Sequence, residues 1–225
     1  MFLSFFIASI ISSVILKKKL PLLLNLFYLT FNLFLILIYY EFIFTGFEND
    51  SRNYYRISSI LFENYSLVDL IQNSSDELFN IDIYLSPLDR QHLLHGNNGI
   101  YYLIYLSFKI FGHSEYALPS LYLITKSVSC IYLYNFLKKK IINFNKCKIF
   151  YFILFLFEPW TVYYNSLFFL KEGTVFFLSV IIILNFFKFV NKFKIKYLFI
   201  LSISIYLLYF FRFYYTYLFT FFFIF

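Results

Sequence analysis

Residues 47–98 read FENDSRNYYRISSILFENYSLVDLIQNSSDELFNIDIYLSPLDRQHLLHGNN and form the longest polar stretch of the chain. No lysine lies in it, but it holds eight of the twelve acidic residues: Glu48, Asp50, Glu63, Asp69, Asp76, Glu77, Asp82 and Asp89. Long apolar segments flank it on both sides. We therefore predict a large loop between membrane-spanning helices, with short surface helices over 54–62 and 67–79 where apolar and polar residues mix at helical spacing.

The composition around this loop is that of a polytopic membrane protein. The chain is 61% hydrophobic and 27% aromatic, with a mean hydropathy of +0.73. A soluble domain of this size does not need so many apolar residues, whereas a membrane protein needs them facing lipid as well as in its core. The net charge of +7 comes from lysine runs beside apolar segments. Such runs indicate topology and contact with membrane lipids rather than nucleic acid binding.

The lysine runs also orient the predicted spans. We expect the runs at 17–19, 138–148 and 188–196 to lie in the cytoplasm, which places the 47–98 loop outside it. The apolar segment 100–111 is about 18 Å long as a helix, too short to cross, and we interpret it as a juxtamembrane helix. The expected crossings are residues 2–16, 20–46, 116–137, 149–164, 173–190 and 197–211.

The predicted fold class is therefore an all-α, polytopic integral membrane protein. It has about six transmembrane helices, a large helical first outer loop and one juxtamembrane helix, and we place it in a bacterial inner membrane. The whole chain, 1–225, forms one transmembrane domain. Its apolar tail stops at Phe225 with no polar segment after it, so we expect further spans to be missing from the C-terminal end.

Three sets of charged residues lie at predicted outer ends of spans. Asp50 begins the polar loop, and an interfacial carboxylate can take the proton of an incoming hydroxyl or help hold a divalent cation. Lys171 and Glu172 open the segment 173–190, and Arg212 follows 197–211. The alternative interpretations are a solvated loop charge for Asp50, a helix cap for Glu172 and an interfacial anchor for Arg212.

The sequence gives little support for a metal centre or a disulfide. His92 and His95 are three residues apart, but no third ligand follows at metal-site spacing. Cys130 lies in an apolar run and Cys147 in a basic one, without paired spacing. Metal ligation is therefore predicted for none of these residues.

Taken together, the order of these features resembles the membrane-embedded C-type glycosyltransferases, which use polyprenyl- or dolichyl-phosphate sugars. In that superfamily a span leads into a large outer loop that opens with an acidic residue and, four positions later, a tyrosine, as at Asp50 and Tyr54. A short apolar helix ending near Phe-Gly follows, as at 101–112. A later outer turn has Pro, Ser and a basic-acidic pair, as at 159–172. The resemblance covers residues 20–212, the N-terminal half of such an enzyme.

The resemblance implies roles for five residues: Asp50 as catalytic base, Glu172 as second acid, and Tyr54, Lys171 and Arg212 as substrate contacts. The implied partners are a lipid-linked sugar donor and a glycan, lipid or protein acceptor, and the one cofactor considered is a divalent cation. Glu172 stands where many members have Asp, and the Tyr-His-Pro-Pro-like stretch is replaced by residues 97–99.

Two other functions fit the same topology. A polymerase-like protein for O-antigen or exopolysaccharide also takes lipid-linked substrates but joins whole repeat units. A non-catalytic fragment of a split gene has the same apolar pattern. A transporter is less favoured, because Lys126 is the one charge well inside a predicted span and no internal repeat is evident.

Overall fold

In the computed structural model, residues 3–38, 49–66, 68, 99–157 and 171–224 are described. Within these ranges every regular element is a helix, so the predicted all-α class is confirmed for the part of the chain described. The elements are α1 (Leu3–Lys17), α2 (Leu22–Ile38), α3 (Asn49–Asn64), α7 (Gly99–Phe111), α8 (Ala117–Lys140), the 3-10 turn η2 (Phe144–Cys147), α9 (Lys148–Phe157), α11 (Glu172–Lys192), α12 (Ile195–Phe211) and α13 (Phe213–Ile224).

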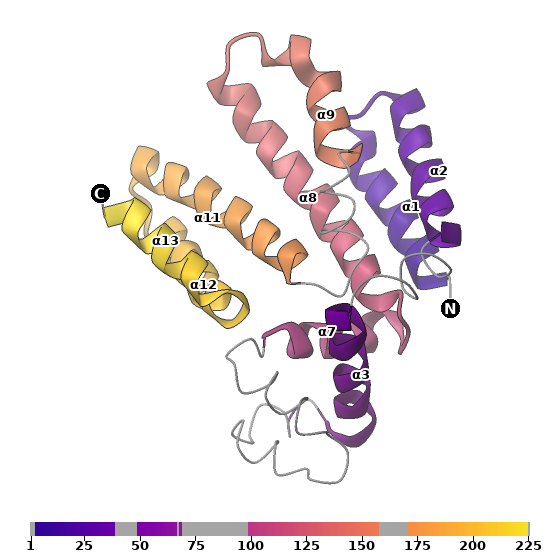
Figure 1. The fold of residues 1–225 in the computed structure, drawn as a ribbon. Helices are drawn as coiled ribbons and strands as arrows, with labels where there is room; N and C mark the ends of the chain where they lie inside the picture. Colours follow the sequence, from indigo (N-terminus) through magenta and orange to yellow (C-terminus); the bar gives the residue numbers. More distant parts are fainter. Residues whose placement is uncertain (1–2, 39–48, 67, 69–98, 158–170, 225) are drawn as a thin grey trace.

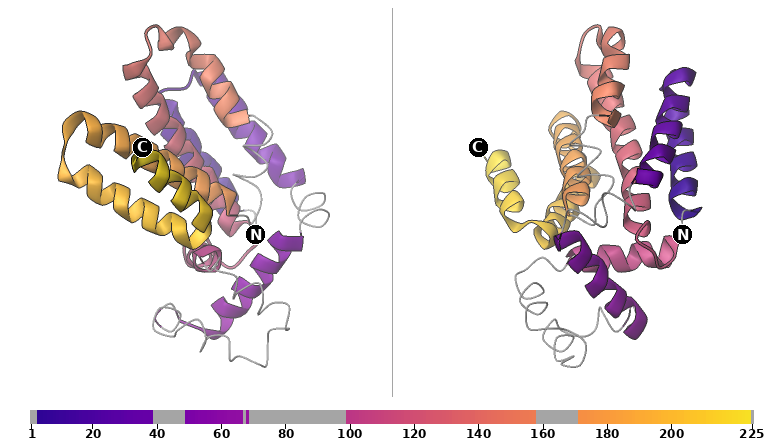
Figure 2. Two further views of the ribbon diagram at one scale, coloured as in Figure 1. Left: turned by 60° about the vertical axis from the view of Figure 1, so that its left-hand side comes forward. Right: turned by 45° about the vertical axis from the view of Figure 1, so that its right-hand side comes forward.

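Helix α8 is the element to which most others attach. It packs against α1, α7, α9 and α11, while α11 continues the bundle to α12 and α12 to α13 (Figure 1). Helices α3 and α7 pack together across one end of this bundle, as the two further views show (Figure 2). The arrangement brings the first turn of α11 and the last turn of α12 toward the same end as α3 and α7 (Figure 1).

Three apolar clusters hold these helices together. The first joins α1, α2, α8 and α9 around side chains such as Tyr28 and Phe152, and the second joins α3, α7 and α8 around Ile57 and Tyr105. The third lies between α11 and α12. Because α8 contributes to the first two clusters, a change in its position shifts both the N-terminal helices and the end cap formed by α3 and α7.

Most predicted helices are present, with boundaries that differ by a few residues. The predicted surface helix 54–62 is the central part of α3, and the predicted short helix 100–111 is α7. The predicted segments 116–137, 173–190 and 197–211 correspond to α8, α11 and α12. Apart from residue 68, the expected helix over 67–79 lies outside the described residues. So does the second half of the segment 149–164, of which α9 is the first half.

Helix length bears on the predicted crossings. Among the described residues, α11 alone combines the length and apolar composition needed to cross a membrane, while α1, part of α2, α7 and α12 are apolar but shorter. Helix α8 has 24 residues, but polar side chains lie along its middle. One of them, Lys126, is 3% exposed and donates a hydrogen bond of 3.1 Å to the Leu156 carbonyl near the end of α9. The arrangement of six crossings stays a prediction.

The segment after α12 was expected as an apolar tail and forms a separate helix, α13. The chain leaves helical geometry at Arg212, whose backbone is extended at φ −155° and ψ 87°. It then turns back along α12, so that α12 and α13 form a hairpin with Arg212 at its turn (Figure 1).

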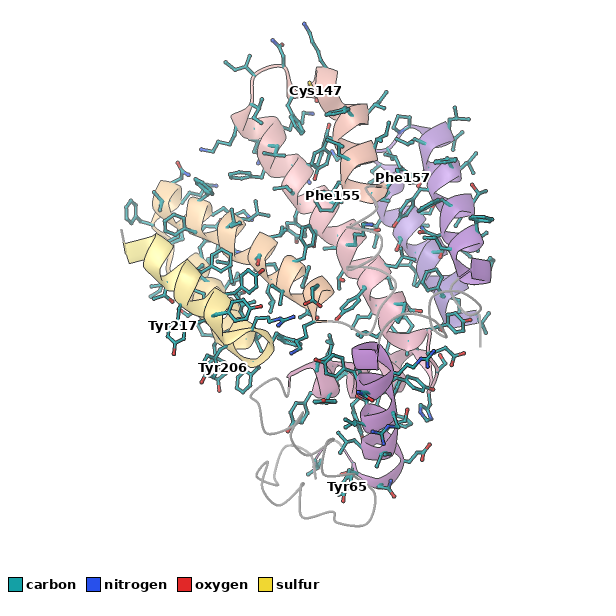
Figure 3. The ribbon with its side chains drawn as sticks, viewed as in Figure 1. Tyr65, Cys147, Phe155, Phe157, Tyr206 and Tyr217 are labelled. Atoms are coloured by element: carbon teal, nitrogen blue, oxygen red, sulfur yellow. The ribbon has the colours of Figure 1, made fainter. Side chains whose placement is uncertain are left out.

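Many of the lysines gather at the opposite end of the bundle. The last turns of α1, α8 and α11 carry Lys17, Lys138 to Lys140, and Lys192. Cys147, in the basic turn between α8 and α9, and Tyr65, just after α3, lie at opposite ends of the molecule (Figure 3). The bundle therefore has a basic end and an end capped by α3 and α7.

Candidate functional site

The site is organised around an ion pair between Glu172 and Arg212. Glu172 is the first residue of α11, where its negative charge is favoured by the helix dipole. Arg212 occupies the turn between α12 and α13, and its Nη2 donates to Oε1 of Glu172. The two side chains are 30% and 34% exposed, for Arg212 and Glu172 respectively. Two charged residues that are 40 positions apart in sequence therefore meet at one partly buried point.

The ion pair favours the charged form of Arg212. Burial lowers the pKa of Arg212, but the hydrogen bond and the charge of Glu172 outweigh it, with smaller contributions from Tyr214 and Tyr54, so that the net pKa is raised. The guanidinium also lies 5.7 Å from the centroid of the Tyr214 ring. The other carboxylate oxygen of Glu172, Oε2, is buried and has no hydrogen-bond partner among the described residues. The carboxylate therefore has one acceptor oxygen that the described residues do not use.

Lys171 and Tyr54 complete the cluster. Lys171 directly precedes α11 and is 4% exposed. Its Nζ lies 5.6 Å from the centroid of the Tyr54 ring, which meets the Tyr101 ring edge-on at 5.5 Å. A buried ammonium over an aromatic face is stabilised by the ring quadrupole. Four of the five residues predicted for the site, Tyr54, Lys171, Glu172 and Arg212, are thus brought together by three separate parts of the chain.

The fifth residue, Asp50, lies in the first turn of α3. Its side chain is outside the described part of the structure, but its position on the helix is known. Residues four apart on a helix share a face, about 6 Å apart, so position 50 is one turn before Tyr54. Two residues of the motif near α11, Pro159 and Ser166, lie outside the described residues, as do His92 and His95.

One cavity adjoins the ion pair, and a second lies near it. The smaller, about 290 Å³, is lined by Glu172, Arg212, Ser179 and Tyr214 together with apolar side chains of α11. The larger, about 770 Å³, lies between α7, α8, α11 and α12 and is mostly apolar. Its lining also carries hydroxyl groups, among them those of Tyr122 and Thr174, which are 3.1 Å apart. Thr174 is two residues after Glu172. A polar point beside a long apolar cavity suits an amphipathic ligand.

Sequence reasoning missed a second polar cluster, at the contact between α3 and the end of α7. His113 follows Gly112, which ends α7 with φ +87°, a conformation that glycine adopts without strain. The His113 Nε2 is 2.9 Å from Ser59 Oγ, and its Nδ1 is 3.8 Å from Glu63 Oε1. Spacing alone does not reveal this contact, because the residues come from elements 54 positions apart. The cluster fastens the end of α7 to α3.

No metal-binding group is found in the described ranges, where no three His, Cys, Asp or Glu side chains gather. Arg212 already neutralises Glu172, so the cationic part of the site is formed by Arg212 and Lys171. The chain was also compared with known proteins. No protein-family model, curated protein or solved structure matches it.

Proposed function

We propose that this chain is part of a membrane-embedded glycosyltransferase that moves a sugar from a lipid-phosphate donor to a cell-envelope acceptor at the outer face of the membrane. The observation that carries the proposal is the cluster of Glu172, Arg212, Lys171 and Tyr54, with a mostly apolar cavity close by whose lining includes Thr174 and Phe211. The two cations and the carboxylate suit the phosphate and sugar of a lipid-phosphate donor, and the apolar cavity suits its lipid chain.

Membrane placement is supported by the outer faces of the helices. Large apolar side chains are exposed on α2, α9 and α12, for example Leu23 at 83%, Phe150 at 63% and Phe199 at 66%. Apolar patches of this extent are unusual on soluble monomers and suit a lipid surround. With the lysine-rich end in the cytoplasm, the Glu172–Arg212 pair faces the outer side.

Each group then has a part in the transfer. The phosphate of the donor would bind to Lys171 and to the guanidinium N–H groups of Arg212 that Glu172 does not use, since an arginine has five such donors. Its polyprenyl chain would lie in the 770 Å³ cavity. The acceptor hydroxyl attacks the anomeric carbon, Asp50 takes its proton, and the bond to the phosphate oxygen breaks with the negative charge held by the cations.

Sugar transfer by the full-length protein tests this assignment. Membranes carrying Asp50→Asn, Lys171→Gln or Arg212→Gln would be assayed with a labelled polyprenyl-phosphate sugar. Loss of the base or of a phosphate contact should lower the rate by about 100-fold or more. Lys192→Gln, at the basic end, is the matched control and should transfer normally. Full activity of Asp50→Asn would refute Asp50 as the base.

A charge exchange separates catalysis from a structural role of the ion pair. In the double variant Glu172→Arg with Arg212→Glu, the pair can form again in reverse. If the pair only joins α11 to the α12–α13 turn, both stability and transfer should return toward the values of the unaltered protein. If the pair serves the phosphate, stability recovers in part while transfer stays lost, because the cation is misplaced.

Topology is tested with the native cysteines. Cys147 is exposed in the basic turn, and Cys130 is buried. A membrane-impermeant maleimide should therefore label Cys147 only after cells are opened, and Cys147→Ser should abolish the labelling. Labelling of Cys147 on intact cells would reverse the proposed orientation and place the ion pair in the cytoplasm.

A further inference from the structure

A cavity of about 400 Å³ lies between α8, α11 and α12, toward the basic end of the bundle. Its polar lining includes Lys188, Lys196, Tyr132 and Tyr197, and its apolar lining includes Ile181 and Ile200. It runs from Phe177 to Lys188 along α11, a distance of about 16 Å at 1.5 Å per residue. This cavity is distinct from the 290 Å³ cavity lined by Glu172 and Arg212 and from the 770 Å³ cavity near them.

The two lysines converge on the same aromatic ring. The Nζ of Lys188 lies 6.0 Å from the Tyr197 ring centroid, and that of Lys196 lies 5.1 Å from it. Lys188 also lies 5.8 Å from the Tyr132 ring. Among the described residues that line this cavity, none is acidic. Two cations from different helices therefore face one opening without a carboxylate to neutralise them.

We propose that this cavity binds an anionic glycerophospholipid of the cytoplasmic leaflet. Its phosphate would contact Lys188 and Lys196, with the tyrosine hydroxyls as further donors, and one acyl chain would lie along Ile181 and Ile200. Basic pockets between helices on the cytoplasmic side are where lipid headgroups bind. The inference rests on the proposed membrane location and is independent of sugar transfer.

The test uses the full-length protein in nanodiscs, with no sugar donor present. Phosphatidylglycerol would be compared with phosphatidylcholine by native mass spectrometry of lipid retained after detergent extraction. We expect the unaltered protein to retain phosphatidylglycerol. The variant Lys188→Gln with Lys196→Gln should bind it about 30-fold more weakly, as expected when two lysine contacts are lost.

The matched control removes the same charge from the same end of the bundle. Lys192 and Lys194 are exposed and do not line the cavity, so Lys192→Gln with Lys194→Gln should retain the lipid. Equal losses in both double variants would overturn the proposal in favour of diffuse attraction to the membrane surface. Equal retention of phosphatidylcholine would also overturn it.

Two further measurements separate the lipid from its headgroup. Ile181→Trp fills the apolar wall and leaves both lysines in place, so it should displace the lipid without loss of helical circular dichroism. Glycerol phosphate should compete only weakly. Complete displacement by glycerol phosphate, together with normal lipid retention by Ile181→Trp, would identify a site for soluble phosphate instead.

Discussion

The ion pair between Glu172 and Arg212 makes a quantitative prediction about stability. Exposed pairs contribute about 0.2–1 kcal/mol, whereas breaking a fully buried pair costs about 3–5 kcal/mol. Because these side chains are about one-third exposed, we expect a coupling free energy of about 1–2 kcal/mol. Arg212→Gln should be the more harmful single change, since it leaves a partly buried carboxylate without its partner, held only by the dipole of α11.

A double-mutant cycle measures this coupling directly. Thermal unfolding of the full-length protein in detergent would be followed by circular dichroism for Glu172→Gln, Arg212→Gln and the combined variant. At about 2–4 °C per kcal/mol for a chain of this size, Arg212→Gln should lower Tm by several degrees. The combined variant should be less destabilised than the sum of the two single changes. A coupling free energy below about 0.3 kcal/mol would refute the reasoning.

Three further predictions concern the contacts around the site. Gly173→Ala places a Cβ 2.9 Å from the Tyr122 ring and should lower the free energy of unfolding by about 1–3 kcal/mol, measured by thermal unfolding. Adding Tyr122→Leu should restore part of this loss. An unchanged Tm for Gly173→Ala would contradict the close approach of α8 and α11. Gly99→Ala, 2.9 Å from the Phe210 carbonyl oxygen, should loosen α7 from α12 and raise hydrogen exchange in α7. Burial, aided by the charge of Glu115, raises the pKa of Tyr55. The stability that this shift contributes is complete below the unfolded pKa of about 10 and is lost as pH rises through the folded pKa. The Tyr55→Phe variant should therefore lose less stability between pH 9 and 11 than the unaltered protein.

Much of the helical pattern is readable from the sequence because apolar runs and lysine clusters are local signals. The apolar segment before Gly112 predicts α7, and the basic-acidic pair Lys171 and Glu172 before an apolar run predicts the start of α11. The turn at Arg212 is harder to predict. The aromatic run continues on both sides of it without proline or glycine, so sequence spacing gives no reason to end α12 there.

The sequence indicates the individual residues of the candidate site but not the contacts between them. Lys171, Glu172 and Arg212 each stand at the end of a predicted span, and that position says nothing about which residue each one contacts. Their pairing depends on α12 packing against α11 and on the chain breaking at Arg212. The contact of His113 with Ser59 and Glu63 was missed for the same reason, because it depends on the packing of α3 against α7.

In the proposed membrane topology, the hairpin of α11 and α12 constrains how the chain would insert. Its lysine-rich connection would lie on the cytoplasmic side, so Glu172 and Arg212 would both have to reach the outer side as the two helices insert. Moving either charge alone through hydrocarbon is expensive, and pairing reduces that barrier. Insertion of α11 and α12 as one unit would allow the two charges to cross as a neutral pair. Synthesis of α12 would then be a precondition for stable insertion of α11.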